Sequence, residues 1–336
     1  MSVAPAAGTR PPGSLRRPPA WVLALLKQFG AALVTLVAIS MVTFGAVNIR
    51  SPESVARDAL GRGVTNGAIQ AFIRERGLDK SIEQRYWDWI SGFARGDLGN
   101  SVITQRPVAD EVVPRFGRTV LLIGLALAIA LPLALAMSLY MARRAGRPDE
   151  AAAVVATIVA ASIPDFVIGI LLLLAFAVAL PILPVSSAGL ALGTPSEQII
   201  AFILPTATLV IVVTPYLARI GRVAIREALE SDFVRAAVLR GTPHRSVVWR
   251  HAMPSAALPL VSATAVSLVW LLGGTIVVEN LFGFPGLGQL LVEAIQTGDT
   301  SMVQAAAAFV GAVFLAVSVA ADGIAVLLNP KLRTSR

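Results

Sequence analysis

Residues 198–218, QIIAFILPTATLVIVVTPYLA, are 21 consecutive positions without Asp, Glu, Lys or Arg. A helix of about 20 mostly apolar residues is long enough to cross the roughly 30 Å hydrocarbon core of a bilayer. Arg219, Arg222 and Arg226 follow it directly. The stretch therefore predicts a membrane helix that runs into a basic loop.

Four further stretches are equally free of charge, and a fifth holds a single acid. The charge-free stretches are 28–49, 119–142, 252–278 and 300–321, and residues 151–180 are interrupted only by Asp165. Together with 198–218 they predict six membrane helices. We expect an all-α integral membrane protein.

The composition supports this class and excludes several others. Of 336 residues, 56% are hydrophobic and 14% are charged, whereas soluble proteins average roughly 45–50% apolar and about 25% charged residues. There is no cysteine, and two histidines leave little for a transition-metal site. None of the three lysines follows a glycine, so the chain lacks the Gly-Lys step of a phosphate-binding Walker A loop.

The distribution of arginine and lysine predicts the orientation. Six helices place both termini on one side, where 17 of the 28 basic residues fall, while the opposite loops 181–197 and 279–299 hold none. Basic residues mark the cytoplasmic side of short loops. We therefore expect cytoplasmic tails at 1–27 and 328–336, and this spread argues against a nucleic-acid surface, which needs clustered arginines.

The first membrane helix, at 28–48, has a second interpretation. Arg16 and Arg17 precede it, as in a secretory signal. Its apolar run is longer than a signal core of about 7–15 residues, and no clear cleavage site follows. We interpret it as a retained anchor.

Residues 49–117 form the expected outer segment between the first and second membrane helices. Ser81 and Gln84 have the spacing of a helix capping box. Two apolar stripes have helical spacing, namely Ile69, Phe72 and Ile73, and then Tyr86, Trp89, Ile90 and Phe93. These stripes predict a helical pair that packs against itself and the membrane domain; a landing surface for an external partner is the alternative.

The longest cytoplasmic loop, 219–255, contains the sequence SDFVRAAVLRGTP at 231–243. Ser231 suits a helix N-cap, Asp232 suits the positive end of the helix dipole, and Gly241 is a stop signal. The predicted short helix presents an apolar surface flanked by two arginines. The surface comprises Phe233, Ala236, Ala237 and Leu239, and the arginines are Arg235 and Arg240.

Two roles are open for this short helix on physical grounds alone. A basic amphipathic segment can lie on anionic lipid at the membrane surface. It can equally be a docking helix that binds another protein on the cytoplasmic face.

The spacing from Ala236-Ala237 to Gly241 and on to Met253-Pro254 resembles the EAA loop of bacterial ABC-importer permeases. In that family, the short helix of this loop sits in a groove of the ATPase subunit. This chain has Arg235 where the general pattern has Glu, and it has His251 and Met253 where the pattern has Ile and Leu.

Other segments resemble the dipeptide, oligopeptide and nickel branch of these permeases along most of the chain. They are Gly77-Leu78-Asp79, Gly96-Asp97-Leu98-Gly99 with Ser101, Pro107-Val108, Pro164 with Phe166, Leu204-Pro205, and Glu279-Asn280-Leu281-Phe282 followed by Pro285-Gly286-Leu287-Gly288. Two sites depart from the pattern, Asn329-Pro330-Lys331 at the tail and Arg50-Ser51-Pro52 after the first helix.

The resemblance implies the type I permease architecture in a bacterial inner membrane, with no enzymatic activity and no cofactor on this chain. Its expected partners are a second, related permease chain as a heterodimer, two cytoplasmic ATPase subunits that hold ATP and Mg, and an extracytoplasmic binding protein. Residues 231–241 would couple to the ATPases. Peptides are the commonest cargo of the family, but nickel chelates, sugars, opines and antibiotics are also carried.

Polar residues near apolar spans are candidates for the solute path, because a charge at mid-membrane costs about 2.5–3.5 kcal/mol or more. Asp165 and Asp322 are two such residues. Pro164 frees a backbone carbonyl, so the chain can kink there and line a polar cavity. The resemblance also places an external gate near Glu279, Phe282, Pro285 and Gly286.

Two other functional classes make different predictions. An ion-coupled secondary transporter or channel would use Asp165 and Asp322 as cation sites and would show internal repeats, which we do not find. An intramembrane hydrolase needs a catalytic constellation such as HExxH, and none is present.

Overall fold

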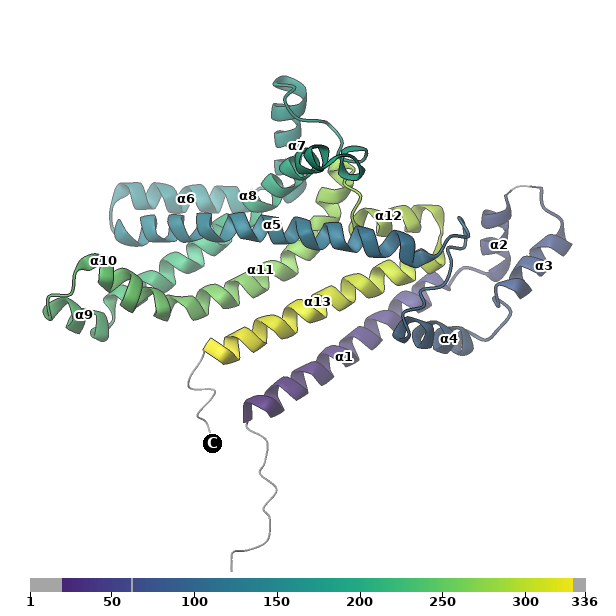
Figure 1. Ribbon diagram of the computed structural model, residues 1–336, viewed down its shortest axis with the longest axis horizontal. Helices are drawn as coiled ribbons and strands as arrows, with labels where there is room; N and C mark the ends of the chain where they lie inside the picture. The colour runs from purple at the N-terminus through teal and green to yellow at the C-terminus, as the bar shows by residue number, and fades with distance from the viewer. Residues whose placement is uncertain (1–19, 62, 329–336) are drawn as a thin grey trace, which may run out of the picture.

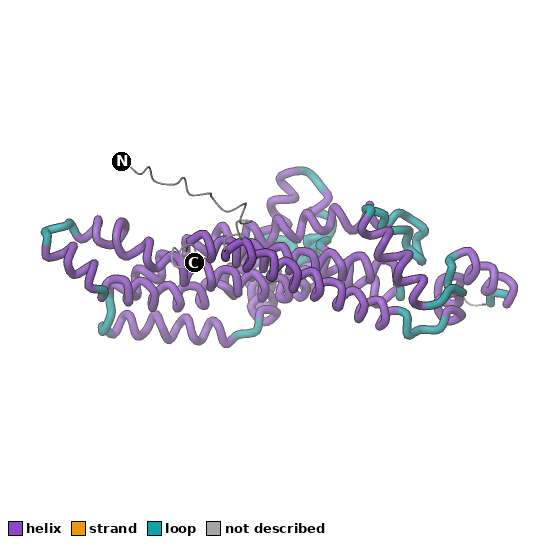
Figure 2. The backbone as a smooth tube through the Cα atoms, turned by 90° about the horizontal axis from the view of Figure 1, so that it is seen from below, coloured by secondary structure: helices purple, strands orange, loops and turns teal. Residues whose placement is uncertain are grey.

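The computed structural model describes residues 20–61 and 63–328, with their side chains except at 20–26, 28, 58, 244 and 320–328. Over this range the chain is helical without a strand, and short loops join the helices (Figure 2). The elements are α1 (Ala20–Val47), α2 (Pro52–Leu60), α3 (Asn66–Glu75), α4 (Ile82–Ala94), α5 (Val108–Arg143), α6 (Pro148–Ser162), α7 (Asp165–Leu173), η1 (Leu174–Ala179), η2 (Leu190–Leu192), α8 (Pro195–Glu230), α9 (Asp232–Leu239), α10 (His244–Ser246), η3 (Val247–Ala252), α11 (Met253–Phe282), α12 (Leu287–Thr297) and α13 (Thr300–Leu328).

Five helices of the described chain are long and apolar enough to cross a membrane: α1, α5, α8, α11 with η3, and α13. The sixth expected span, 151–180, is a bent pair rather than one helix. α6 and α7–η1 meet at 94° (Figure 1). The break falls at Ile163, whose backbone is extended, because the ring of a following proline disfavours helical backbone at the preceding residue. α5 also begins ten residues before the expected start of the second span, at Val108.

The centre of the bundle is a close packing of α5 on α8 and of α8 on α11. Ala126, Ala130 and Ala134 of α5 are almost completely buried there. A Cβ atom on Gly221 would lie 2.3 Å from the Ser138 hydroxyl oxygen, which shows how closely α5 and α8 approach. Small residues allow such contact between membrane helices, where dispersion rather than a hydrophobic driving force holds them together.

One buried hydroxyl compensates a proline inside α8. Pro205 has no backbone N–H, so the carbonyl of Ala201, four residues earlier, lacks its helical donor. The Ser187 hydroxyl donates to that carbonyl at 2.9 Å, and the Ser187 backbone N–H donates to the carbonyl of Phe282 at 2.8 Å. Ser187 therefore ties the loop before α8 to both α8 and α11.

The outer segment consists of three short helices at one end of the long axis (Figure 1). The aromatic stripe of α4 is half-buried and packs on the membrane domain: Tyr86 and Trp89 contact Phe44 of α1, and Phe93 contacts Phe309 of α13. The stripe of α3 instead packs on Val55 and Ala56 of α2. The expected pairing of these two stripes is therefore wrong, because α2, a helix not anticipated from the sequence, covers α3.

A buried carboxylate fastens the outer segment to α13. Asp299, 3% exposed, precedes the first residue of α13 and accepts a backbone N–H bond from Met302 at 3.2 Å. It also accepts bonds from the Ser101 hydroxyl and from the Val102 N–H, the latter at 3.3 Å. One side chain thus caps a membrane helix and holds the loop before α5.

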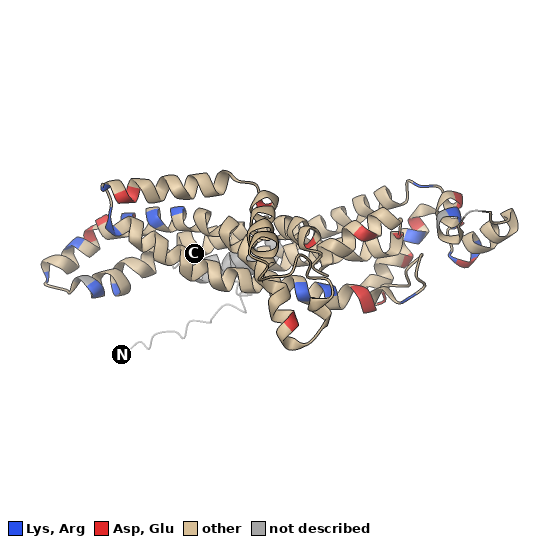
Figure 3. Ribbon diagram, turned by 90° about the horizontal axis from the view of Figure 1, so that it is seen from above, with Lys and Arg blue, Asp and Glu red and all other residues tan. Residues whose placement is uncertain are grey.

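Many charged residues of the described part lie toward the two ends of the molecule, and fewer lie near its middle (Figure 3). The end that carries α9 is rich in Lys and Arg. The start of α1 and the end of α13 both point toward this end, away from α2–α4 (Figure 1). Of the expected tails 1–27 and 328–336, residues 1–19 and 329–336 lie outside the described residues, and residues 20–27 already belong to α1.

Candidate functional site

The short helix expected between Ser231 and Gly241 is present as α9. Gly241 adopts φ +77°, its N–H donates to the Val238 carbonyl at 2.9 Å, and the N–H of Thr242 donates to Ala237 at 3.1 Å. These bonds satisfy carbonyls that a helix end leaves without partners. The left-handed backbone at Gly241 therefore ends the helix, as the sequence indicates.

Ser231 stands at the N-cap position of α9, but its side chain does not cap that helix. Its hydroxyl instead donates to the Ala228 carbonyl at 2.5 Å, at the end of α8. This difference arises because the last carbonyls of α8 also need donors. Ser231 is the single residue between the two helices.

The two faces of α9 differ from the surface expected from the sequence. Val234 and Ala237 are 3% and 1% exposed, and Val234 lies in a buried cluster with Ala228, Val247 and Ala252. The expected placement of Ala237 on the outer apolar surface is therefore wrong, because that side of the helix packs on α8 and η3.

The outward face of α9 stays uncovered. Phe233 is 47% exposed and Leu239 is 88% exposed. Ala236 is partly exposed between them, and Asp232, Arg235 and Arg240 are exposed on the same helix. An apolar surface with two flanking arginines thus projects from the end of the bundle.

An ion pair that the sequence did not reveal braces the base of this projection. The Arg222 Nε donates to Glu150 Oε1 at 2.7 Å, and the Gly146 N–H donates to Glu150 Oε2 at 2.6 Å. Glu150 is 5% exposed. The pair joins the first turn of α6 to the part of α8 that leads into α9, and the Gly146 bond holds the preceding loop to the same carboxylate.

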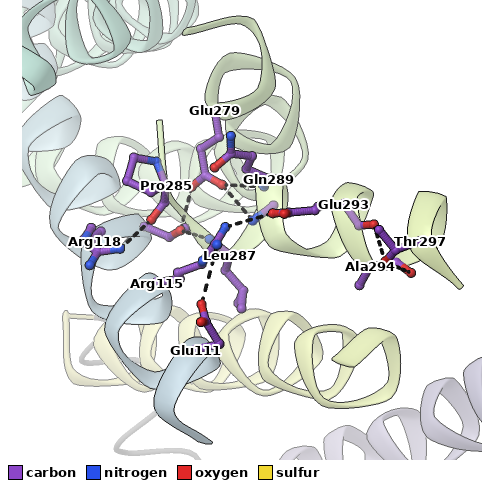
Figure 4. Close-up of polar contacts among 12 residues, drawn as sticks. Glu111, Arg115, Arg118, Glu279, Pro285, Leu287, Gln289, Glu293, Ala294 and Thr297 are labelled. Atoms are coloured by element: carbon purple, nitrogen blue, oxygen red, sulfur yellow. Dashed lines mark hydrogen bonds and ion pairs between the residues drawn. The ribbon is translucent and has the colours of Figure 1, made fainter. Parts of the chain in front are cut away.

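The outer turn between α11 and α12 is built around Glu279, whose side chain is fully buried (Figure 4). Its carboxylate accepts the Thr119 hydroxyl at 2.6 Å and the backbone N–H groups of Gly288 and Gln289 at 2.7 and 3.0 Å. The Leu287 N–H in turn donates to the Thr119 oxygen at 2.8 Å. Glu279 therefore satisfies the first N–H groups of α12, where the helix dipole also favours a negative charge.

The other expected gate residues surround the same turn. A Cβ atom on Gly286 would lie 2.1 Å from Glu279 Oε1, so only glycine fits there. The Pro285 carbonyl accepts a bond from Arg118 at 2.9 Å, and Phe282 is 1% exposed. The structure thus brings Glu279, Phe282, Pro285 and Gly286 together, but as a packed turn. The cavity beside Glu279 is about 10 Å³, close to the volume that a single water needs.

Asp165 lies at a larger opening inside the bundle. It is the first residue of α7, directly after the 94° bend, and lines a cavity of about 490 Å³. The cavity walls come from α8 and α11, with Tyr216 and Arg219 on the former and Ser267, Trp270 and Gly274 on the latter. Its volume lies within the range typical of small-molecule sites. The side chain of Asp322 lies outside the described residues.

A bundle of membrane-length helices, with a cavity between α7, α8 and α11 and an exposed short helix at one end, defines a membrane transport subunit. Residues 126–334 match the family described as binding-protein-dependent transport system inner membrane component, and residues 22–123 match the description of its N-terminal part. The chain belongs to this family.

Relatives along almost the whole chain agree. The chain is 31% identical over 309 residues to the glutathione transport system permease protein GsiC of Pectobacterium atrosepticum, which covers 92% of this chain and 98% of the relative. It is 30% identical, with the same coverage, to GsiC of Escherichia coli strain K12 and of Shigella flexneri. The chain is therefore a multi-pass inner-membrane permease subunit of an ABC importer of the peptide branch. Such permeases are not enzymes, and the ATPase activity sits on separate subunits.

Proposed function

We propose that this chain forms half of the path through which an ABC importer moves a peptide or a peptide-like solute, by alternating access. α9 is the observation that carries this proposal, because an apolar surface at the end of a membrane protein is otherwise exposed to water. α9 docks into a groove of a cytoplasmic ATPase subunit, and residues 231–241 transmit the movement of that subunit.

The position of α9 at one end of the bundle also supports an orientation of the chain in the membrane. The basic α9 end faces the cytoplasm, in agreement with the excess of basic residues on that side. The end with α2–α4 and α12 then faces outward, where an extracytoplasmic binding protein delivers the solute. A related permease chain completes the path as a heterodimer, and two ATPase subunits hold ATP and Mg, so this chain needs no cofactor of its own.

The relatives at 30–31% identity are named as glutathione permeases, which supports a peptide-sized, charged solute here. The ion-coupled alternative built on Asp165 and Asp322 is not favoured, because the family consists of binding-protein-dependent systems. Nothing described in the chain requires an ion gradient.

The test is purification of the chain from its native membrane in mild detergent, with assays for a bound ATPase subunit and for ATP hydrolysis. Ala236→Asp places a charge on the outward face of α9 and should release the ATPase. Ala71→Asp is the matched control, since Ala71 is an exposed alanine on α3 at the opposite end. A chain that purifies alone and supports uptake without ATP would contradict the proposal.

A further inference from the structure

The cavity between α7, α8 and α11 contains one feature that the proposed function does not explain: an acid and a base among its lining residues. Asp165 and Arg219 both line it and are both half-buried. Asp165 interrupts the apolar stretch 151–180, and a charged group within a membrane span is costly and typical of substrate paths. The partial exposure of Asp165 and Arg219 to the cavity keeps them available to a solute.

The register of α8 against α11 sets the separation of the two charges. Tyr216 of α8 contacts Trp270 of α11, with ring centroids 5.6 Å apart and the ring planes tilted by 35°. The two helices run in opposite directions, so residues four positions from this contact also face each other. Gly274 of α11 therefore lies at about the same depth in the bundle as Val212 of α8, and both line the cavity. A Cβ atom on Gly274 would lie 3.0 Å from Asp165 Oδ2, so the Asp165 carboxylate is at this level.

Arg219 is seven residues farther along α8 than Val212. At 1.5 Å per residue, the Cα atom of Arg219 lies about 10 Å farther along the axis of α8 than that of Val212. An extended peptide advances at most about 3.3–3.6 Å per residue, so a tripeptide has nearly the same length. A cavity of about 490 Å³ also has room for a solute of this size.

The wall between the two charges is apolar and aromatic. Trp270 is 66% exposed and stands with Tyr216 beside Val213 and Leu271. Such a surface accepts varied side chains by dispersion contacts, and its rings attract a passing ammonium group. A path also needs contacts that are weak enough to release the solute, and two partly hydrated charges provide this.

We propose that this cavity holds a zwitterionic peptide of about three residues, with its ammonium group at Asp165 and its carboxylate at Arg219. The inference rests on the proposed import function and adds the chemical class of the solute and the orientation in which it is bound. The amino end faces the level of the α6–α7 bend, and the carboxyl end faces the α9 side. Charge pairing at both ends selects for free termini, whereas the aromatic wall leaves the side chains unspecified.

The test uses the complete permease and ATPase complex in lipid nanodiscs, without binding protein, so that selection by the latter does not interfere. Dissociation constants are measured by saturation-transfer NMR for trialanine, glutathione, N-acetyl-trialanine and trialanine amide. The variants are Asp165→Asn and Arg219→Gln. Arg226→Gln is the control, because Arg226 is exposed on the same helix beyond the cavity.

In the wild type, blocking either terminus of trialanine should weaken binding about tenfold, as expected for the loss of roughly 1.4 kcal/mol. In Asp165→Asn, acetylation should no longer matter while amidation still does, and Arg219→Gln should show the reverse. A folding defect would weaken all four probes alike and could not produce this crossed pattern.

Two results would contradict this inference and leave the proposed function intact. One is a complex that imports solute with ATP but binds blocked and free peptides equally. The other is a complex that imports a different solute and binds neither trialanine nor glutathione. A complex that shows no ATP-driven uptake with its binding protein would instead contradict the proposed function.

Discussion

Glu279 holds three parts of the chain together through one buried side chain. The resemblance pointed to a gate, yet its carboxylate is fully buried and accepts three hydrogen bonds that fasten α12 to α11 and α5. An acid so completely engaged acts as a brace for the outer turn. Any movement of the gate must then carry this turn as one body, because separating it would leave buried donors without partners.

Glu279→Ala should therefore lower the stability of the purified complex by about 2 kcal/mol or more, since each buried unsatisfied group costs about 1–3 kcal/mol. Thermal unfolding is the measurement. Gly286→Ala should act on the same contact, because its Cβ atom would lie 2.1 Å from Glu279 Oε1. The two changes together should cost clearly less than their sum.

Two controls accompany this pair. Glu293→Ala removes an exposed partner of Arg115 and should change stability by less than about 0.5 kcal/mol. Gly189→Ala adds a Cβ atom that meets nothing within 4 Å. Strict additivity of Glu279→Ala and Gly286→Ala would show that the brace does not exist.

The site residues could be predicted from sequence only where the signal is local. Gly241 and the start of α9 at Ser231 were found because helix stop and start signals act over a few positions, although the Ser231 hydroxyl binds the end of α8 instead. Arg219 was missed as a cavity residue, because its place beside Asp165 depends on how α8 packs on α7 and α11. In sequence it appeared only as one of many loop arginines.

At the scale of one element, the end of α9 depends on backbone conformation rather than on space. A Cβ atom on Gly241 meets nothing within 4 Å, yet φ is +77°. Gly241→Val should therefore strain the turn by about 1–2 kcal/mol and shift the docked population of α9 by a factor of about 5–30. The ratio of solute imported to ATP hydrolysed should fall accordingly in proteoliposomes.

Gly241→Asn is the matched control for this prediction, because asparagine tolerates left-handed backbone. Its coupling ratio should stay near that of the wild type. Equal and normal coupling in both variants would mean that the helix stop has no part in transmitting ATPase movement.

The helical spans were predictable for a simple reason: the bilayer requires apolar residues over a fixed length. Pro164 also indicated a kink, but the size of the bend, 94°, depends on what α6 and α7 pack against. α2 was missed because its nine residues, Pro52–Leu60, include three charges and only a short apolar face. Short amphipathic helices of this kind depend on a partner to cover them.

At the scale of the whole molecule, Asp299 decides whether the outer segment and the membrane domain move together. Asp299→Ala removes the acceptor for Ser101, Val102 and Met302, at about 1–3 kcal/mol for the buried donors left behind. Limited proteolysis should then cut the loop at 95–107 faster. Asp299→Asn keeps one acceptor oxygen, so its cleavage rate should lie between those of the wild type and of Asp299→Ala. An unchanged cleavage rate in Asp299→Ala would show that Asp299 does not hold this loop.

α8 runs unbroken for 36 residues, from the outer loop that Ser187 holds to the single residue before α9. At 1.5 Å per residue it is about 54 Å long. If it pivots about its middle by about 10°, each end travels about 5 Å, and the two ends travel in opposite directions. A displacement of α9 toward the bundle axis then moves the opposite end of α8 away from that axis. Opening of the proposed path at one end therefore favours its closure at the other end.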